Sequence, residues 1–212
     1  MIILLNGTSS AGKTSIARVL QQGFNGILLY YGVDIMVQGA FPEKCDEPPW
    51  DEHAIRLRTS EIDGVSHATL QVSPYMYPVY RSAVAFYRDL SRQGYDLIVD
   101  EVLFDARRVD AYFELLRDER VHFIGVKPEK AVAIERERAR GDRIPGLAAG
   151  LYDEVYHPAF EYDLLLDTGR ATPHEAAAAI LHHLDAVPQP TGFRDSAARW
   201  PGDGVLRRQD VT

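Results

Sequence analysis

The residues best suited to chemistry lie near the start of the chain, in the pattern Gly7-x-x-x-x-Gly12-Lys13-Thr14. The pattern follows an apolar run and precedes a helical pattern, which is the context of a phosphate-binding loop, and this context disfavours a chance glycine-rich turn. In such loops glycines let the backbone approach phosphate, the lysine bridges the β- and γ-phosphates, and the threonine hydroxyl ligates Mg²⁺. The sequence therefore predicts a site for ATP and Mg²⁺. Its expected contacts are Gly7, Ser9, Ser10, Ala11, Gly12, Lys13, Thr14 and Ser15.

A second candidate group is the acidic end of the apolar segment Tyr95–Glu101. A buried strand that ends in an acid places a carboxylate at the edge of the sheet, close to a metal bound by the phosphate loop. We expect Asp100 to be this metal ligand and take Glu101 as the second candidate. The alternative is that the acid caps the next helix.

Asp34 follows Tyr31-Gly32-Val33, directly after the second predicted strand, so it is expected at the same edge as the phosphate loop. Small-molecule kinases need a carboxylate there to accept or orient the proton of the attacking hydroxyl. Aspartate is also a favoured helix cap, so the residue pattern alone leaves catalytic base and helix cap open.

Arginines are concentrated in the segment 135–143, where Arg136 and Arg140 have the i,i+4 spacing of one helix face and Gly141 ends the helical pattern. Together with Arg143 they are predicted to bind the nucleotide from a lid at about residues 136–150, which a loop at Ile144–Ala148 continues. Their guanidinium groups could neutralise charge on the transferred phosphoryl. The alternative is a solvated helix end that is held by salt bridges.

The elements expected to position these residues alternate between short apolar runs and helical patterns, which is typical of an α/β fold. We predict a P-loop kinase fold, with a doubly wound, mostly parallel five-stranded sheet and helices on both faces. The predicted strands are Met1–Leu5, Gly26–Tyr30, Leu97–Val99, Val121–Val126 and Leu164–Leu166. The predicted helices are Lys13–Gln22, Tyr75–Gln93, Val109–Arg117, Pro128–Arg140 and Pro173–Leu184.

Two segments interrupt this alternation. Alternating apolar residues flank Asp63-Gly64, and this pattern predicts a β-hairpin insertion at about residues 54–72. Residues 187–212 are rich in Pro, Gly, Arg and Asp, so we expect a C-terminal tail that is disordered or lies over the surface. One kinase domain is therefore expected over residues 1–186.

The composition disfavours several classes of protein. The net charge is −8 and the chain has no basic run, which argues against a nucleic-acid partner. A single cysteine, Cys45, excludes an internal disulfide framework. The N-terminus lacks the basic flank of a signal peptide and no apolar run is long enough for a membrane span, so we expect a cytoplasmic protein without a membrane partner.

Together these segments resemble the chloramphenicol phosphotransferase family over about residues 1–185. The pairing of Gly32-Val33-Asp34 with Ala139-Arg140-Gly141-Asp142-Arg143 is far more discriminating than the phosphate loop, which very many NTPases share. The resemblance rests on Ile3–Ala17, Gly32–Asp34, Ile62–Val65, Leu97–Val102, Ala139–Arg143 with Gly146, Val155–His157, Tyr162–Leu164 and Asp167-Thr168.

The resemblance implies a cytoplasmic kinase that moves the γ-phosphoryl of ATP to a hydroxyl of an antibiotic. It puts the family's catalytic aspartate at Asp34, its loop lysine at Lys13 and its lid arginines at Arg140, with Arg136 and Arg143 as further candidates. The chain departs from the family pattern at Pro48-Pro49-Trp50, in the hairpin and in the tail, which all bear on the choice of acceptor.

We therefore predict an ATP-dependent phosphotransferase with a small-molecule hydroxyl acceptor, antibiotics included. One alternative is a kinase of a nucleoside, sugar or cell-wall precursor. Another is a non-catalytic NTP-dependent regulatory protein, which would have no need of Asp34. The sequence names neither the acceptor nor the oligomeric state, and a homo-oligomer remains open.

Overall fold

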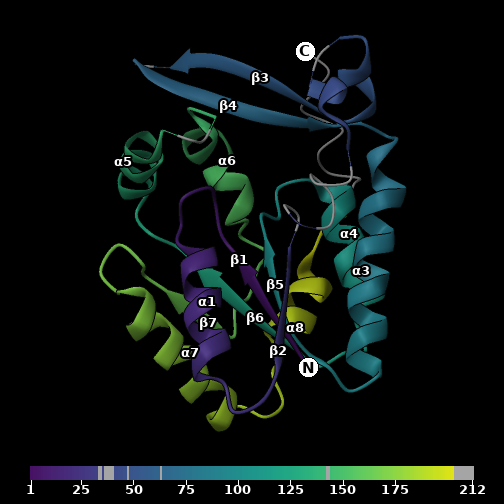
Figure 1. Cartoon of the computed structure of the whole chain (residues 1–212), viewed down its shortest axis with the longest axis vertical. Coiled ribbons are helices and arrows are strands. Elements are labelled where there is room, and N and C mark those ends of the chain that lie inside the picture. The colour runs from purple at the N-terminus through teal and green to yellow at the C-terminus, as the bar shows by residue number, and fades with distance from the viewer. Residues whose placement is uncertain (33–34, 36–40, 47, 63, 142–143, 203–212) are drawn as a thin grey trace.

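A five-stranded parallel sheet forms the centre of the protein (Figure 1). The computed structural model describes residues 1–32, 35, 41–46, 48–62, 64–141 and 144–202. The strand order is β2-β5-β1-β6-β7, and every pair is parallel, which confirms the predicted α/β sheet. The strands are β1 (Ile2–Asn6), β2 (Leu28–Gly32), β5 (Asp96–Glu101), β6 (Val121–Val126) and β7 (Leu164–Leu166).

Helices cover both faces of the sheet, as the doubly wound prediction requires. In β1, Ile2 and Leu4 face one core cluster while Ile3 and Leu5 face another. Because both faces are buried, this strand is apolar throughout rather than alternating. The first cluster includes residues of α3 (Met76–Arg92), α4 (Ala106–Leu115) and α8 (Gly192–Arg199), and the second includes residues of α1 (Lys13–Gly23) and α7 (Pro173–Ala186).

The chain adds its strands first on one side of β1 and then on the other. The chain places β5 on one side of β1 and β6 on the other, with Asn6 beside Glu101 and Gly125. In an open parallel sheet the carboxyl ends of the strands at such a point border a crevice in which ligands bind. The predicted phosphate loop follows β1 and therefore lies at this crevice.

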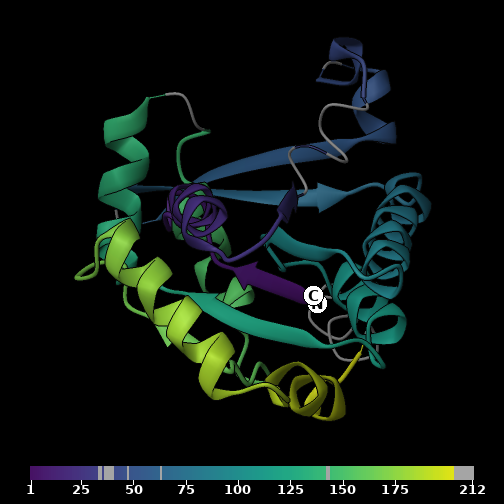
Figure 2. The same ribbon diagram turned by 60° about the horizontal axis from the view of Figure 1, so that its bottom comes forward.

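A two-stranded hairpin lies apart from the main sheet, beyond its carboxyl edge (Figures 1 and 2). It consists of β3 (Ile55–Ile62) and β4 (Val65–Val72) in antiparallel pairing. Strand β4 packs closely on α6 (Leu147–Val155). The approach is so close that a Cβ added at Gly150 of α6 would overlap the carbonyl of Ala68 in β4, so glycine is needed there.

Helix α6 begins at Leu147, inside the loop expected at Ile144–Ala148. Its first amides are capped from another helix, since the Gly146 and Ala148 amides donate to the Glu137 carboxylate at 2.7 and 2.8 Å. Glu137 belongs to α5 (Lys130–Arg140) and is buried. A cap supplied by a distant side chain leaves no local capping signal in the sequence.

The C-terminal segment contradicts the expectation of a tail that is disordered or lies over the surface. Residues 192–199 form α8, and Phe193 is buried between aromatic rings of the first cluster. Asp163 accepts hydrogen bonds from the Thr191 and Gly192 amides, and the Trp200 indole donates to Asp110 at 2.7 Å. The prediction is therefore wrong for residues 192–200, and residues 203–212 lie outside the described part of the chain.

Helix α4 begins at Ala106, three residues before the predicted start at Val109, because the Asp105 carboxylate caps it by accepting from the Arg108 amide at 3.1 Å. No helix in the described part of the chain has both the length and the apolar character needed to cross a membrane.

Candidate active site

The loop between β1 and α1 has the backbone of a phosphate-binding loop. A Cβ at Gly7 would lie 2.5 Å from the Val126 carbonyl, so only glycine fits there. Gly12 caps α1 in the left-handed region with φ 99°, and Ser10 is also left-handed with φ 59°. The Lys13 ammonium lies within the loop and donates to the carbonyl of Gly7 at 2.7 Å. The loop therefore surrounds one buried cation at the N-terminus of a helix, where anions bind favourably.

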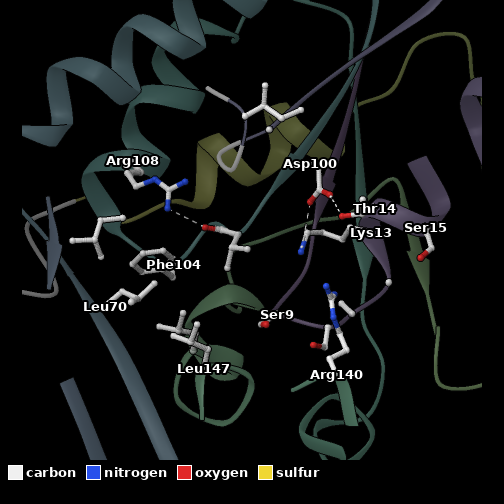
Figure 3. Close-up of a pocket in the computed structure, with 18 of the residues that line it drawn as sticks. Ser9, Lys13, Thr14, Ser15, Leu70, Asp100, Phe104, Arg108, Arg140 and Leu147 are labelled. Carbon is white, nitrogen blue, oxygen red and sulfur yellow. Dashed lines mark hydrogen bonds and ion pairs between the residues drawn. The ribbon is translucent and has the colours of Figure 1, made fainter. Parts of the chain in front are cut away.

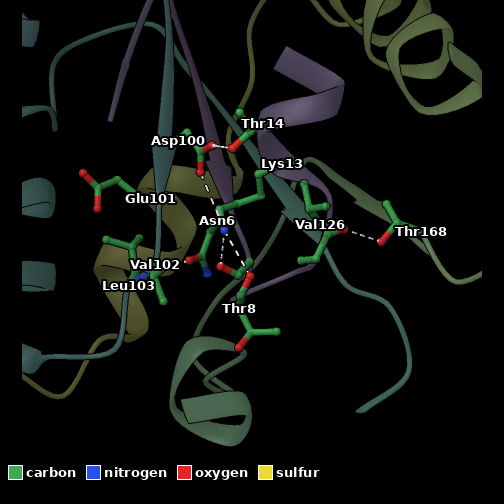
Figure 4. Close-up of polar contacts among 12 residues, drawn as sticks. Asn6, Thr8, Lys13, Thr14, Asp100, Glu101, Val102, Leu103, Val126 and Thr168 are labelled. Carbon is green, nitrogen blue, oxygen red and sulfur yellow. Dashed lines mark hydrogen bonds and ion pairs between the residues drawn. The ribbon is translucent and has the colours of Figure 1, made fainter. Parts of the chain in front are cut away.

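Asp100 lies next to this loop, at the carboxyl end of β5 (Figure 4). Its Oδ2 accepts hydrogen bonds from the hydroxyls of Thr14 and Tyr30, both at 3.0 Å, and its Oδ1 lies 3.6 Å from the Lys13 ammonium. A hydroxyl and a carboxylate in contact are oxygen donors of the kind that Mg²⁺ prefers, together with phosphates and water. Thr14 and Asp100 therefore fit the metal site predicted for them.

Glu101, the second candidate, faces the opposite side of the sheet. It forms an ion pair with Arg108 at 2.7 Å and accepts from the Tyr112 hydroxyl at 2.6 Å. Burial raises the pKa of Glu101, although the guanidinium and the hydroxyl counteract this. Because successive side chains of a strand point to opposite faces, only one of the two acids can reach the phosphate loop.

A first cavity lies between the phosphate loop and α5, and we call it the α5-side cavity. Arg136 and Arg140 line it from α5, and Arg136 donates to the Thr168 carbonyl at 2.7 Å. Thr168 follows β7 and its hydroxyl donates to the Ala11 carbonyl at 2.8 Å. The cavity is lined by Ser10, Gly12, Ser15, Ile16, Arg136, Ala139, Arg140, Thr168, Ala171 and Pro173.

A second cavity extends from the same loop towards the hairpin, and we call it the hairpin-side cavity (Figure 3). One end is polar and contains Lys13, Thr14, Asp100 and Arg140. The other end is largely apolar and is lined by Ile55, Leu70, Tyr80, Val102, Phe104, Leu147 and Leu151, with Arg108 among them. Ser10, Gly12, Ser15 and Arg140 line both cavities, so the two meet at the phosphate loop.

Two polar side chains, the buried Asn6 and the partly buried Tyr156, fix the loop to its surroundings. Asn6 donates to the Val155 carbonyl at 2.8 Å and accepts from the Leu103 amide at 3.0 Å (Figure 4). The Tyr156 hydroxyl donates to the Val126 carbonyl at 2.6 Å and accepts from the Thr8 amide at 3.1 Å. Burial raises the pKa of Tyr156, so its hydroxyl keeps its proton. The end of α6 is thereby joined to the strand ends and to the loop.

The structure brings most of the predicted site residues together. Lys13, Thr14, Asp100 and Arg140 share one cavity, and Arg136 lies in the adjoining one. Asp34 and Arg143 lie outside the described residues.

Sequence analysis assigned no site role to three residues at these cavities, although Asp167-Thr168 was part of the family resemblance. Tyr30 and Arg108 carried no recognisable motif. Thr168 follows the predicted last strand, and its position at that strand end was a usable signal.

Comparisons with known proteins agree with this geometry. The family described as chloramphenicol phosphotransferase-like protein matches residues 1–185. Two relatives from Mycobacterium tuberculosis strains, named "Putative O-phosphotransferase Rv2636" and "Putative O-phosphotransferase MT2714", are each 30% identical over 199 residues. Each alignment covers 91% of this chain and 85% of the relative.

Solved structures with similar folds include kinases and a resistance protein. The APS kinase of Mycobacterium tuberculosis has a TM-score of 0.58 at 14% identity and covers 87% of this chain and 97% of its own. The shikimate kinase of Aquifex aeolicus has a TM-score of 0.54 at 17% identity, and the match covers 89% of this chain and 98% of its own. The tunicamycin resistance protein of Deinococcus radiodurans has a TM-score of 0.55 at 20% identity, and the match covers 89% of this chain and 96% of its own. At these identities the similarity shows the fold, and it confirms the predicted P-loop kinase fold.

Proposed function

The chain belongs to the chloramphenicol phosphotransferase-like protein family, and from this premise we propose that it transfers the γ-phosphoryl group of ATP to a hydroxyl group of a small molecule. The observation that carries the proposal is the meeting of two differently lined cavities at one phosphate loop. One cavity suits a nucleotide and the other suits an acceptor, and Lys13 and Asp100 line the second cavity beside the phosphate loop that both cavities share.

On the nucleotide side, the loop amides and Lys13 would hold the β- and γ-phosphates, and Arg136 and Arg140 would lie against the base or the phosphates. Thr14 and Asp100 would hold Mg²⁺, which supplies charge compensation on the phosphate oxygens. Arg143, although outside the described residues, is proposed as a third arginine of this group.

In the transfer step, the oxygen of the acceptor hydroxyl attacks the γ-phosphorus and the bond from that phosphorus to the β–γ bridging oxygen breaks. The products are a phosphate ester and ADP. Asp34 is proposed to take the proton released by the hydroxyl. Lys13 and Arg140 would stabilise the negative charge on the transferred group, which requires placement more than covalent help from the protein.

The acceptor would bind in the hairpin-side cavity, with its hydroxyl towards Lys13 and its body against the apolar end. That lining favours a substrate with a hydrophobic portion, which includes antibiotics such as chloramphenicol, over a small polyol. A regulatory NTP-binding protein remains distinguishable by experiment, because it would need no hydroxyl compound for turnover.

The test is a screen of hydroxyl compounds, chloramphenicol among them, for ADP release that depends on the compound in the presence of ATP and Mg²⁺. We expect at least one compound to stimulate ADP release and to be recovered as its phosphate ester by mass spectrometry. Transfer to another compound but not to chloramphenicol would retain the kinase and discard that drug. ATP binding without transfer to any compound would instead favour the regulatory protein.

Asp34→Asn separates a catalytic base from a helix cap in the same assay. The amide keeps a capping oxygen but cannot take a proton, so we expect a loss of about 10²- to 10⁴-fold in kcat with normal ATP binding. Asp153→Asn on the exposed face of α6 is the control. Near-normal turnover by Asp34→Asn would assign the residue to structure.

A further inference from the structure

Tyr30 places a hydroxyl group against the carboxylate that is proposed to hold the metal. It lies on β2 and lines the hairpin-side cavity, and its partly buried ring packs against the second core cluster. The hydroxyl donates to Asp100 Oδ2 at 3.0 Å. The contact joins residues that are 70 positions apart in the chain, so only the folded sheet reveals it.

The pairing of β2 with β5 explains why Tyr30 reaches this carboxylate. Gly32 is the residue opposite Asp100, and a Cβ there would lie 2.5 Å from the Asp100 carbonyl oxygen. Glycine therefore lets the two strands approach, and it leaves no side chain of β2 directly opposite Asp100. Because residues two apart in a strand share a face, the Tyr30 ring lies on the same face and can extend towards the carboxylate.

The two oxygens of Asp100 are used differently by the residues around them. Oδ2 accepts from the hydroxyls of both Tyr30 and Thr14 at 3.0 Å, and Figure 3 shows the contact with Thr14. A carboxylate oxygen has two lone pairs, so these two donors occupy its acceptor positions. Oδ1 lies 3.6 Å from the Lys13 ammonium, beyond hydrogen-bond distance. Among the described residues, Oδ1 is therefore the oxygen left for a metal or its bound water.

A carboxylate that offers a single oxygen discriminates between divalent cations. Mg²⁺ requires a small octahedral shell and keeps several waters, whereas Ca²⁺ takes about six to eight oxygen ligands and often binds both oxygens of one carboxylate. Hydrogen bonds from neighbouring groups also fix the orientation of a ligating carboxylate, and their loss weakens metal binding. The contact between Tyr30 and Asp100 therefore suits a site that prefers the smaller ion.

We infer that Tyr30 is a positioning residue that makes the nucleotide site selective for Mg²⁺ over Ca²⁺, by occupying Oδ2 of Asp100 and fixing the carboxylate. Tyr30 acts through Asp100 and is not itself a metal ligand. The inference rests on the proposed function, since it takes Thr14 and Asp100 as the ligands of the metal that accompanies ATP.

The selectivity is measured first on the unaltered chain, without an acceptor. Calorimetry gives the affinity for a non-hydrolysable ATP analogue in excess Mg²⁺, in excess Ca²⁺ and in EDTA. We expect the Mg²⁺ complex of the analogue to bind more tightly than the Ca²⁺ complex. Equal affinities for the two complexes, or tighter binding of the Ca²⁺ complex, would overturn the inference.

Tyr30→Phe assigns the selectivity to the hydroxyl, because it removes one oxygen and keeps the ring. The affinity for the Mg²⁺ complex should fall about tenfold, as when a hydrogen-bond partner of a metal ligand is lost. The affinity for the Ca²⁺ complex should fall less, and the affinity in EDTA should not change. An unchanged ratio of the Mg²⁺ and Ca²⁺ affinities would contradict the inference, and equal weakening in all three conditions would assign Tyr30 to structure alone.

Tyr31→Phe is the matched control, because Tyr31 is the next residue of β2, packs against the first core cluster and lines neither cavity. It should leave all three affinities unchanged. In an Asp100→Ala background, Tyr30→Phe should have no further effect, since Tyr30 acts through that carboxylate. If Tyr30→Phe fails to fold by circular dichroism, the ranking of Mg²⁺ and Ca²⁺ on the unaltered chain decides.

These binding measurements separate the inference from the proposed function, because they involve no phosphoryl transfer. Selectivity that depends on Tyr30 in a chain that phosphorylates no hydroxyl compound would contradict the kinase and leave the role of Tyr30 intact. Phosphoryl transfer by a chain whose metal selectivity is the same with and without the Tyr30 hydroxyl would contradict that role and leave the kinase intact.

Discussion

The two ends of the hairpin-side cavity differ in how the sequence builds them. The phosphate end comes mainly from one continuous segment, Ser9–Ser15, with Asp100 from the neighbouring strand and Arg140 from α5. The apolar end draws Ile55, Leu70 and Phe104, with Leu147, from separate segments. Chemistry that needs a fixed geometry is thus encoded locally, whereas the surface that selects an acceptor depends on how distant segments pack.

The two ends are nevertheless mechanically connected. Glu137 links α5, which carries Arg136 and Arg140, to the first turn of α6. Helix α6 in turn holds the hairpin, since the Ala68 amide donates to the Gly146 carbonyl at 2.9 Å. A substitution at one end of the cavity can therefore shift the position of residues at the other end, because α6 contacts both.

The largest effect should come from Lys13→Ala at the phosphate end. The variant loses the cation inside the loop, so we expect kcat to fall by on the order of 10³- to 10⁵-fold, as for other cations on a transferred phosphoryl group. ATP binding should weaken while the fold is kept, as measured by calorimetry and circular dichroism. Lys130→Ala, which removes a surface ion pair with Asp153, is the control. Turnover close to that of the unaltered chain would show that the phosphate end of the cavity does not carry out the transfer.

The next largest effect should come from Gly150→Val at the contact between α6 and the hairpin. The added side chain would overlap the Ala68 carbonyl, so we expect a loss of about 1–3 kcal/mol in the free energy of unfolding. The acceptor KM should rise more than the ATP KM. Gly23→Ala at the end of α1 serves as control, because a Cβ added there would meet only the tip of the Leu181 side chain, at 3.3 Å, and Gly23 lines neither cavity. Equal increases of both KM values would show that the two ends are not separable.

A smaller effect is expected for Leu70→Ala in the apolar end. Loss of the side chain removes contacts with the acceptor body, so the acceptor KM should rise about tenfold while the ATP KM is unchanged. Leu165→Ala on β7 removes the same atoms from a side chain that is 55% exposed, and it should change neither constant. An unchanged acceptor KM in Leu70→Ala would place the acceptor elsewhere.

The smallest effect concerns the scaffold away from both ends, where His122 Nδ1 lies 3.3 Å from His183 Nε2. Burial, reinforced by His183, lowers the pKa of His122 to about 4, from an ordinary value of 6.5. The unfolded chain therefore binds more protons between these values, so stability is full above pH 6.5 and declines as the pH falls towards 4.

The expected slope is roughly 1 kcal/mol or less per pH unit in the free energy of unfolding. Urea unfolding across this pH range measures it, and His122→Phe should flatten the dependence. Because neither histidine lines the two cavities, the protonation of His122 should not affect the affinity for ATP. A stability profile that is the same with and without His122 would exclude the pair as its source.

Sequence reasoning predicted the sheet and the phosphate loop because their signals are local. The apolar run of β1 and the spacing of Gly7, Gly12 and Lys13 lie within a few residues of one another. The family resemblance is likewise confirmed, since it depended on short motifs. The roles of the site residues, including those of Asp34 and Arg143 outside the described part of the chain, stay predictions.

What the sequence did not reveal depends on partners far along the chain. Helix α8 was missed because distant residues hold it: Phe193 packs in the first core cluster, Asp163 accepts from the Gly192 amide, and Asp110 accepts from the Trp200 indole. The start of α6 was missed because its cap comes from Glu137 in another helix. Arg108 was missed because its contacts with Glu101 and with the rings of Tyr80 and Phe104 exist only in the folded chain.

The most direct test of the account follows the phosphorus atom itself. The protein is incubated with ATP labelled at the γ-phosphorus, Mg²⁺ and a hydroxyl compound identified by the screen, and ATP labelled at the α-phosphorus is the control. The account predicts that the γ-label appears in the organic product, that the α-label does not, and that Lys13→Ala abolishes the transfer. Label that appears only in inorganic phosphate, whichever compound is added, would contradict it.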